Sequence, residues 1–452
     1  MTGQSESIAL YGGAGLRAWQ TRCMTPADAQ ACVRALADEL TLRFPRARTI
    51  AVVEGPAPAR PADLWEAAFR ARGRTAVVGG VRDLAGAMGT ADVVVDAWYA
   101  GGGTACAPET VEALAHRAGP IVALGVPACV DPDRGTVAAM SYRAAVTYLE
   151  AVTALGVWTG AARECCGSFQ RIGGVQDVDV SPRAWIPGMD SLRHRLPRRP
   201  QHAHKGTAGT VLIVGGDEGM PGAVRLAAAA AYRTGAGLVG AIVHPRNAPG
   251  LAAAYPELIA PMPAQVAPLW ARADVAVVGS GLGRGDFARA QWAAWNEHAI
   301  ATVIDGDGLY WLAQERGVAA DIVTPHEGEA ARLLGCTVGE IGADRPAAAR
   351  AIARDYDSIC VLKGAGTLID DGMQTWVCPF GNPAMATAGM GDVLAGIIGA
   401  LLGQGADERS AAILGVFVHS CAGDAASARI GARGIVARDV IEEIPACLSV
   451  YL

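Results

Sequence analysis

The chain has 452 residues, of which 51% are hydrophobic and 18% charged; this length suggests two or three domains, and this composition excludes an intrinsically disordered chain. The net charge of -6 is mild and spread along the chain, so we expect no nucleic-acid partner. The 11 cysteines are scattered, without a C-x-x-C pair, which favours reduced thiols over a disulfide framework or a metal site.

The N-terminal segment MTGQSESIALYGG has no basic stretch followed by an apolar core, so we expect no signal peptide. No apolar stretch of the sequence is expected to reach membrane-spanning length. Together these features predict a cytoplasmic protein without a membrane partner.

Residues 1–195 are predicted to form a first, doubly wound α/β domain. Helical apolar spacing covers residues 24–44, with Thr25 as its cap. Short apolar runs followed by loops predict buried strands at 49–53, 75–79, 92–96 and 121–126. Asp96 ends one of these strands, before the glycine-rich residues 99–103. It is either a ligand at the strand end or, as we favour, a turn acid.

The polar, proline-containing segment 196–205 predicts a linker to a second α/β domain, residues 206–452. A strand is predicted within residues 209–216 and leads into a glycine-rich loop. A helix follows, with Pro221 near its start and Gly235 at its C-terminal end. Further strands are predicted at 274–278, 302–304, 322–323 and 360–362, each followed by a polar or glycine-containing loop. We expect these loops to gather at one edge of a sheet.

The segment 389–402 places Gly389 and Gly391 before Asp392 and an apolar helical run. Glycines before a helix let the backbone approach an anion, at which the first N–H groups of the helix point. The helix dipole is expected to keep Asp392 ionised at neutral pH. Such a carboxylate can take a proton from a hydroxyl while the loop holds a phosphoryl group. The alternative, an ordinary N-cap before a buried helix, stays open on this segment alone.

The second half of the chain closely resembles the dehydratase domain of the NAD(P)H-hydrate repair enzymes. The resemblance spans residues 204 to about 445, and its motifs are GGDEGMPGAVRLA, GSGLG, DGDGL, TPHEGEAARLLG, VLKGAGT and GNPAMATAGMGDVLAGIIGALL. It implies a ribokinase-like fold and ADP-dependent dehydration of the S form of NADH or NADPH hydrate, with ATP as donor in eukaryotes. The ring hydroxyl is phosphorylated, and loss of phosphate restores the dihydronicotinamide and leaves AMP.

The resemblance also implies roles for individual residues. Asp392 would be the base on the substrate hydroxyl, and the nucleotide would be contacted by Lys363, Gly364, Ala365, Gly366, Thr367, Gly389 and Gly391. The hydrate would be bound by Ala223, Gly283, His326 and Asp392, and Glu329 would orient Mg²⁺ and its waters. Plainer readings compete: a turn histidine for His326, a solvated strand-end lysine for Lys363, and helix N-terminal stabilisation for Glu329.

The sequence departs from the family pattern at four positions. The family usually has proline at Ser280 and at Glu327, asparagine at Tyr310 and glycine at Ala388. We expect Tyr310 and Glu327 to reshape the substrate side of the site, so the pattern supports nucleotide use more strongly than hydrate specificity.

The first domain resembles the family's hydrate epimerase, but only at residues 92–102 and 122–135. Residues 54–58 replace its phosphate loop, Gly125 replaces an aspartate, and Ala128 and Cys129 replace the serine and glycine of its Ile-Pro-Ser-Gly motif. Asp96 alone cannot build the family's K⁺ site, and no lysine precedes Lys205. We therefore predict that epimerase activity is lost and that the domain serves packing or oligomerisation, in a homo-oligomer.

Three functions compete at this stage. The first is an ADP-dependent NAD(P)H-hydrate dehydratase, a lyase whose partners are the hydrate and ADP. The second is an ATP-dependent kinase of a small hydroxylated substrate, similar to hydroxyethylthiazole kinase, which the departure at Tyr310 keeps open. The third is a non-catalytic regulator, which the intact Asp392 and its glycines disfavour.

Overall fold

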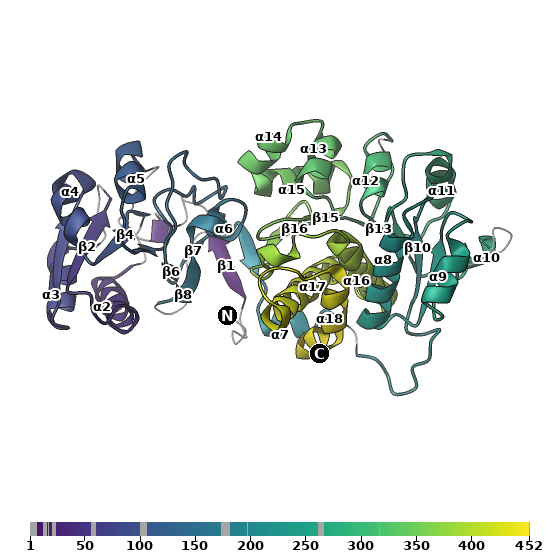
Figure 1. Cartoon of the computed structure of the whole chain (residues 1–452), viewed down its shortest axis with the longest axis horizontal. Helices are drawn as coiled ribbons and strands as arrows, with labels where there is room; N and C mark the ends of the chain where they lie inside the picture. Colours follow the sequence, from purple (N-terminus) through teal and green to yellow (C-terminus); the bar gives the residue numbers. More distant parts are fainter. Residues whose placement is uncertain are drawn as a thin grey trace. The chain divides into compact units, whose positions relative to one another are not determined.

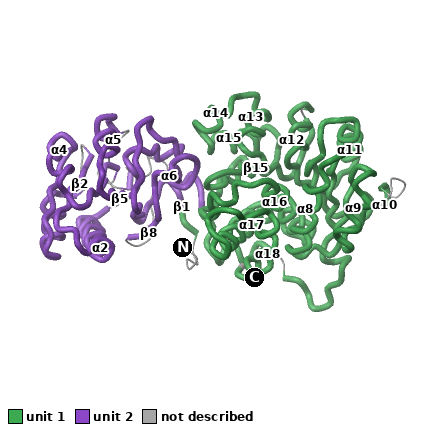
Figure 2. Tube along the Cα trace, viewed as in Figure 1, with its two compact units in different colours: residues 1–8, 186–452 green, residues 9–185 purple. Residues whose placement is uncertain are grey.

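The computed structural model describes the chain except for residues 1–6, 12–15, 17, 20–23, 56–59, 100–105, 173–180, 197, 261–265, 316 and 452. The chain forms two compact units, residues 9–185 and residues 1–8 with 186–452 (Figure 2). The segment predicted as a linker, 196–205, therefore falls within the larger unit. The Arg199 guanidinium explains this placement, because it donates to the Gly235 carbonyl and to Gln404 Oε1 of that unit.

The smaller unit contains a six-stranded parallel sheet in the order β3-β2-β4-β5-β6-β8. Its strands are β2 (Thr49–Glu54), β3 (Thr75–Gly79), β4 (Val93–Ala97), β5 (Ile121–Leu124), β6 (Val146–Leu149) and β8 (Ser168–Arg171), and β1 (Ile8–Tyr11) pairs with β7 (Thr153–Ala154). The helices are α2 (Pro26–Arg43), α3 (Ala62–Arg70), α4 (Val81–Thr90), α5 (Pro108–Ala115) and α6 (Ala162–Cys165). The four predicted strands and the doubly wound class are confirmed.

The start of α2 shows why the sequence-based boundary was accurate. The Thr25 side chain accepts a hydrogen bond from the Asp28 N–H at 3.2 Å, and the Asp28 carboxylate accepts one from the Thr25 N–H at 3.0 Å. This reciprocal capping box satisfies two N–H groups that a helix start otherwise leaves unpaired. The apolar face of α2 is buried in the core of the unit, where Val33, Leu36 and Leu40 are fully covered.

The larger unit contains parallel strands in the order β11-β10-β12-β13-β14-β15, followed by antiparallel β16 and β17. Their bounds are β10 (Thr210–Val214), β11 (Leu238–Ile242), β12 (Val275–Val278), β13 (Ala301–Ile304), β14 (Ile322–Val323), β15 (Ile359–Leu362), β16 (Leu368–Asp370) and β17 (Thr375–Val377); β9 spans Ala184–Ile186. The strands are buried, as their unbroken apolar runs predicted.

The helices of the larger unit are α7 (Met189–Arg193), α8 (Pro221–Thr234), α9 (Ala248–Ala254), α10 (Ala267–Trp270), α11 (Asp286–Asn296), α12 (Asp307–Leu312), α13 (Glu327–Leu334), α14 (Val338–Ala343), α15 (Arg345–Asp355), α16 (Met390–Gly403), α17 (Glu408–Ile430) and α18 (Ala437–Tyr451). Helix α16 packs between α8 and α17 and contacts β10, β12 and β13 (Figure 1). A Cβ at Gly396 would overlap the Ala227 carbonyl, so this glycine allows α16 and α8 to pack closely.

Helix α17 corrects the expectation that no stretch reaches membrane-spanning length. By length and composition, Glu408–Ile430 is apolar enough to cross a membrane. However, 72% of its most apolar window is buried inside the protein, as is typical of the core helix of a folded domain. Its apolar residues are explained by contacts with α16 and α18.

Candidate active site

The candidate site lies at the carboxyl edge of the sheet in the larger unit. Strands β12, β13, β14 and β15 run parallel, so the loops that follow them meet at one edge, as predicted. The loops after β12 and β13 touch: Gly279 has a φ of 124°, and a Cβ there would overlap the Asp305 carbonyl. Because only glycine allows this approach, the GSGLG and DGDG loops can form one continuous surface.

The N-terminus of α16 points into this surface. The helix begins at Met390, Gly389 occupies the cap position with a φ of 91°, and Asp392 is the third helical residue. The alternative in which Asp392 is the N-cap is therefore wrong. A Cβ at Gly391 would lie 3.3 Å from both Asp305 Oδ2 and Lys363 Nζ, so the first turn of α16 lies directly against these two charged groups.

The environment of Asp392 tunes it for proton transfer. Burial raises the pKa of its carboxyl to about 6; the charge of Asp305 adds to the rise, and the Ser280 hydroxyl and Lys363 oppose it. The expectation from the helix dipole had the opposite direction. At pH 7 the carboxyl is still mostly ionised, because this pH lies above its pKa. A carboxylate with a pKa near the working pH is well suited to act as a general base.

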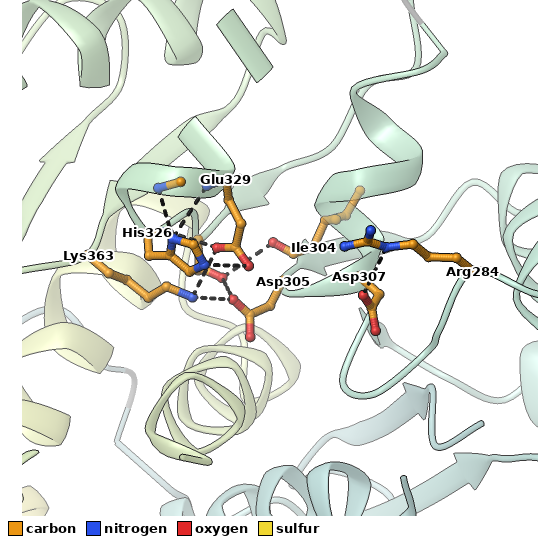
Figure 3. A network of polar contacts seen from close by, with 9 residues as sticks. Arg284, Ile304, Asp305, Asp307, His326, Glu329 and Lys363 are labelled. Carbon is orange, nitrogen blue, oxygen red and sulfur yellow. Dashed lines mark hydrogen bonds and ion pairs between the residues drawn. The ribbon is translucent and has the colours of Figure 1, made fainter. Parts of the chain in front are cut away.

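Lys363 is not a solvated strand-end lysine. Its side chain is only 19% exposed, and its Nζ lies 2.6 Å from Asp305 Oδ1 and 3.7 Å from Glu329 Oε2 (Figure 3). Burial alone would lower the pKa of Lys363, but these two carboxylates raise it above its usual range. The ammonium group is therefore charged at the centre of the site, where it can neutralise phosphate oxygens.

His326 and Glu329 form the N-terminal cap of α13. His326 Nδ1 accepts from the Gly328 N–H at 2.9 Å, and Glu329 Oε2 accepts from the His326 N–H at 2.8 Å. Both plainer readings therefore describe real contacts. Both residues nevertheless line a cavity, and burial raises the pKa of Glu329 while Lys363 opposes the rise.

The predicted nucleotide loop, Lys363 to Thr367, follows β15. Its backbone is held by Arg345, which is 1% exposed and donates to the Lys363 carbonyl at 3.2 Å. The same guanidinium pairs with Glu327. Glu327 is thus linked through Arg345 to the predicted nucleotide loop. The sequence analysis did not identify Arg345, because this residue belongs to none of the motifs. The glutamate at position 327 was the only signal that a buried cation could lie nearby.

A cavity of about 290 Å³ opens beside this network, lined by Gly281, Arg284, Gly306, Asp307, His326, Gly328, Glu329 and Arg332. Figure 3 shows Arg284 with Asp307 apart from the group formed by His326, Glu329, Asp305 and Lys363. The predicted substrate residue Gly283 adjoins the cavity, and its N–H donates to Asp307 Oδ2 at 2.9 Å. Ala223 lies on α8 and packs so closely against Gly281 of the cavity wall that a side chain at position 281 would touch the Ala223 Cβ.

A magnesium site made entirely by protein groups is not present among the residues that the structure describes, since no three acidic, histidine or cysteine side chains converge in metal-binding geometry there. The chemistry of the site still fits Mg²⁺. This ion is commonly held by one or two carboxylates, several waters and the phosphates of the substrate. Glu329 is the carboxylate at the cavity wall that could orient such an ion.

In the smaller unit, Asp96 is completely buried at the end of β4. Its carboxylate accepts hydrogen bonds from the Tyr142 hydroxyl, the Ala128 N–H at 2.6 Å and the Trp98 N–H at 3.1 Å. Burial raises its pKa to about 6. Of the glycine-rich segment predicted after it, only Tyr99 is described; residues 100–103 lie outside the described residues, as do residues 56–58 of the loop at 54–58.

The fold and the site at α16 define an α/β protein of the ribokinase-like class. A ribokinase-like superfamily protein from Enterococcus faecalis is 26% identical, with a TM-score of 0.54 over 58% of this chain and 95% of that chain. The ADP/ATP-dependent NAD(P)H-hydrate dehydratase of Bacillus subtilis, co-crystallised with ATP and Mg²⁺, is 26% identical, with a TM-score of 0.53 over 58% of this chain and 97% of that one.

The family model described as NAD(P)H-hydrate dehydratase matches residues 211–446. The bifunctional NAD(P)H-hydrate repair enzyme Nnr of Coxiella burnetii is 40% identical over 370 residues, which cover 78% of this chain and 75% of that protein. The ADP-dependent (S)-NAD(P)H-hydrate dehydratase of Neisseria meningitidis is also 40% identical, over 55% of this chain and 87% of that protein. The chain belongs to the NAD(P)H-hydrate dehydratase family, as the resemblance implied.

Proposed function

We propose that the protein is an ADP-dependent dehydratase that converts the S form of NADH or NADPH hydrate back to NADH or NADPH, with AMP and phosphate as the other products. One observation carries the proposal: Asp392, with a pKa of about 6, stands in the first turn of α16 beside the buried Lys363. Family membership, the relatives' names and the ribokinase-like fold support it.

In the first step Asp392 accepts the proton of the ring hydroxyl, and the hydroxyl oxygen attacks the terminal phosphorus of ADP. The bond to the AMP oxygen breaks. The free N–H groups at the start of α16 and the Lys363 ammonium stabilise the charge on the transferred group. Phosphorylation turns hydroxide, a poor leaving group, into a good one. Loss of phosphate, with a proton from the neighbouring ring carbon, then restores the ring double bond.

Mg²⁺ bound with the nucleotide would neutralise phosphate charge. We propose that Glu329 orients this ion and its waters, and that Lys363 to Thr367 with Gly389 and Gly391 contact the nucleotide. Ala223, Gly283 and His326 are proposed to line the hydrate site: His326 lines the cavity, Gly283 donates to Asp307 of its wall, and Ala223 lies against Gly281 of its wall.

The test is recovery of reduced nicotinamide from NADH hydrate and NADPH hydrate with purified full-length protein. Absorbance of the dihydronicotinamide should return with ADP, and AMP should form in equal amount. Asp392→Ala should abolish recovery while nucleotide binding survives. A stable phosphorylated hydrate would instead indicate a kinase, and near-normal rates in Asp392→Ala would show that another group is the base.

We further propose that the smaller unit has lost epimerase activity and its K⁺ site. The contacts of Asp96 with the described residues support this, because both its oxygens accept hydrogen bonds there, from Tyr142, Ala128 and Trp98. The full-length Asp392→Ala protein provides the test, because it should not consume the hydrate. Incubated with R hydrate, it should produce S hydrate no faster than buffer does. A faster rate would mean that the unit is an active epimerase.

A further inference from the structure

Two arginines of the cavity wall share one aromatic ring. The Arg284 guanidinium lies 4.3 Å from the centre of the Tyr310 ring, and the Arg332 guanidinium lies 5.6 Å from it. Both distances are within the range of cation–π attraction. The three residues come from the loop before α11, from α12 and from α13, and α12 packs against α13.

This arrangement concentrates positive charge. Two guanidinium groups on one ring lie within about a Debye length of each other, so they repel unless an anion or an acid compensates them. Asp307 only partly does so, because its carboxylate is 3.8 Å from Arg284 Nε and also accepts from the Gly283 N–H. Arg332 makes no ion pair with any residue that the structure describes. The cavity wall therefore carries one guanidinium, that of Arg332, without a direct ion-pair partner among the described residues, although Glu329 lines the same cavity.

The chemistry favours a phosphate group as the missing anion. Guanidinium groups present planar forks of N–H donors that match phosphate oxygens, and contact with a ring face holds such a fork in place before a ligand arrives. In this chain the ring of Tyr310 supplies that face to both guanidinium groups.

We propose that Arg284 and Arg332, held against Tyr310, bind a phosphate group of the dinucleotide substrate. The inference rests on the proposed function for the identity of that substrate. The phosphate is either the bridging pyrophosphate, present in NADH and NADPH hydrates alike, or the 2′-phosphate, present only in the NADPH form. The bridging group would give equal recognition of both hydrates, and the 2′-phosphate would make the enzyme selective for the NADPH hydrate.

The experiment titrates the full-length protein with NADH, NADPH and ADP, which bind without turnover, and follows dihydronicotinamide fluorescence or heat. Arg332→Ala should raise the NADPH dissociation constant roughly tenfold, since a charge-assisted contact is lost. An equal rise for NADH assigns the site to the pyrophosphate, and no rise for NADH assigns it to the 2′-phosphate. A rise for ADP alone, or no rise for any ligand, overturns the proposal.

Two further variants separate charge from structure. Tyr310→Asn should weaken the same ligand roughly threefold, and Tyr310→Phe, which keeps the ring face, should not. Arg289→Ala, an exposed arginine on α11 outside the cavity lining, is the matched control for loss of one positive charge. These titrations need no chemical step, so the two proposals can fail separately. If the protein has no dehydratase activity but its affinity depends on Arg332, the proposed function is refuted and the proposed phosphate site stands. If the protein is an active dehydratase whose affinity does not depend on Arg332, the proposed phosphate site is refuted and the proposed function stands.

Discussion

The pKa of Asp392 is raised by some of its neighbours and lowered by others, and Ser280 is one of the groups that lower it. The Ser280 hydroxyl is buried and lowers the pKa of Asp392, yet it has no hydrogen-bond partner of normal geometry among the described residues. A hydroxyl that approaches the base without being fixed elsewhere is free to donate to its charged form. Ser280 is thus a positioning residue in this proposal.

The first prediction concerns the pH profile. The base works when deprotonated, so kcat/KM should fall as the pH drops through about 6. Removing the hydroxyl in Ser280→Ala should raise the pKa of Asp392 and move this acid limb upward by roughly half a pH unit. Ser358→Ala removes a buried hydroxyl that has no hydrogen-bond partner in the described part of the chain and lies far from α16 in sequence, so it should leave the limb in place. An unshifted limb in Ser280→Ala would show that the hydroxyl does not act on the base.

The second prediction concerns Lys363, whose removal leaves Asp305 and Glu329 facing each other without a cation. Both carboxyls are largely buried, so Lys363→Ala should lower the free energy of unfolding by about 2–4 kcal/mol at pH 7.5 and should also weaken nucleotide binding. The loss should shrink toward pH 5, because the pKa of Glu329, already raised, rises further and protonation removes the repulsion. Urea unfolding at the two pH values measures this. The exposed Lys205→Ala is the control, and an equal loss at both pH values would contradict the electrostatic cause.

At the scale of elements, α16 links the core to the chemistry. Its glycines let it pack against α8, and its first turn delivers Gly391 and Asp392 to the polar network. The positions of β10, β12, β13, β14 and β15 and of helices α8 and α16 agree with the sequence prediction, because unbroken apolar runs between glycine-rich loops are characteristic of buried parallel strands. Strands β11, β16 and β17 were not predicted. The hold of Arg345 on the nucleotide loop had no such signal, since its partners are distant in sequence.

The third prediction tests the entry into α16 with a matched pair of glycines. Gly389 and Gly405 both have a φ of 91°, but a Cβ at Gly389 would overlap Leu226, and a Cβ at Gly405 meets nothing within 4 Å. Gly405→Ala should therefore cost only about 1 kcal/mol, the strain of the backbone conformation. Gly389→Ala should cost about 1–3 kcal/mol more and should lower kcat, because relief of the overlap moves the first turn. Equal losses of stability, with kcat unchanged, would show that the turn is not positioned by Gly389.

At the scale of the whole molecule, the two units differ in what their buried charges do. In the larger unit, carboxylates and a lysine converge beside a cavity; in the smaller unit, Asp96 is enclosed by its own hydrogen bonds. The resemblance to the epimerase predicted loss of activity from missing residues. The structure adds a physical reason for that proposal, since both carboxylate oxygens of Asp96 already accept hydrogen bonds from described groups of the same unit.

The fourth prediction follows from the pKa of Asp96, which burial raises to about 6. An acid with a raised folded-state pKa favours the protonated folded protein, so the wild type should lose stability as the pH rises from about 4 to about 6. In Asp96→Asn this part of the pH dependence should disappear, while the rate of hydrate dehydration with ADP stays unchanged. Urea midpoints across this window and the absorbance assay measure the two effects. A fall in dehydration rate would mean that Asp96 supports the larger unit.

The sequence by itself determined the α/β class, the buried parallel strands that precede the site loops, helices α2, α8 and α16, the family and the principal candidate residues, because apolar runs and glycine motifs are local patterns. It did not predict β11, β16, β17 or most of the other helices. Only the tertiary structure decided that Asp392 lies inside the helix, that Lys363 is buried between two carboxylates, and that Tyr310 holds two arginines on the cavity wall. Those properties depend on burial and on contacts between loops far apart in the chain. A linear pattern contains neither the distance between two charges nor the exclusion of water that gives that distance its energetic weight.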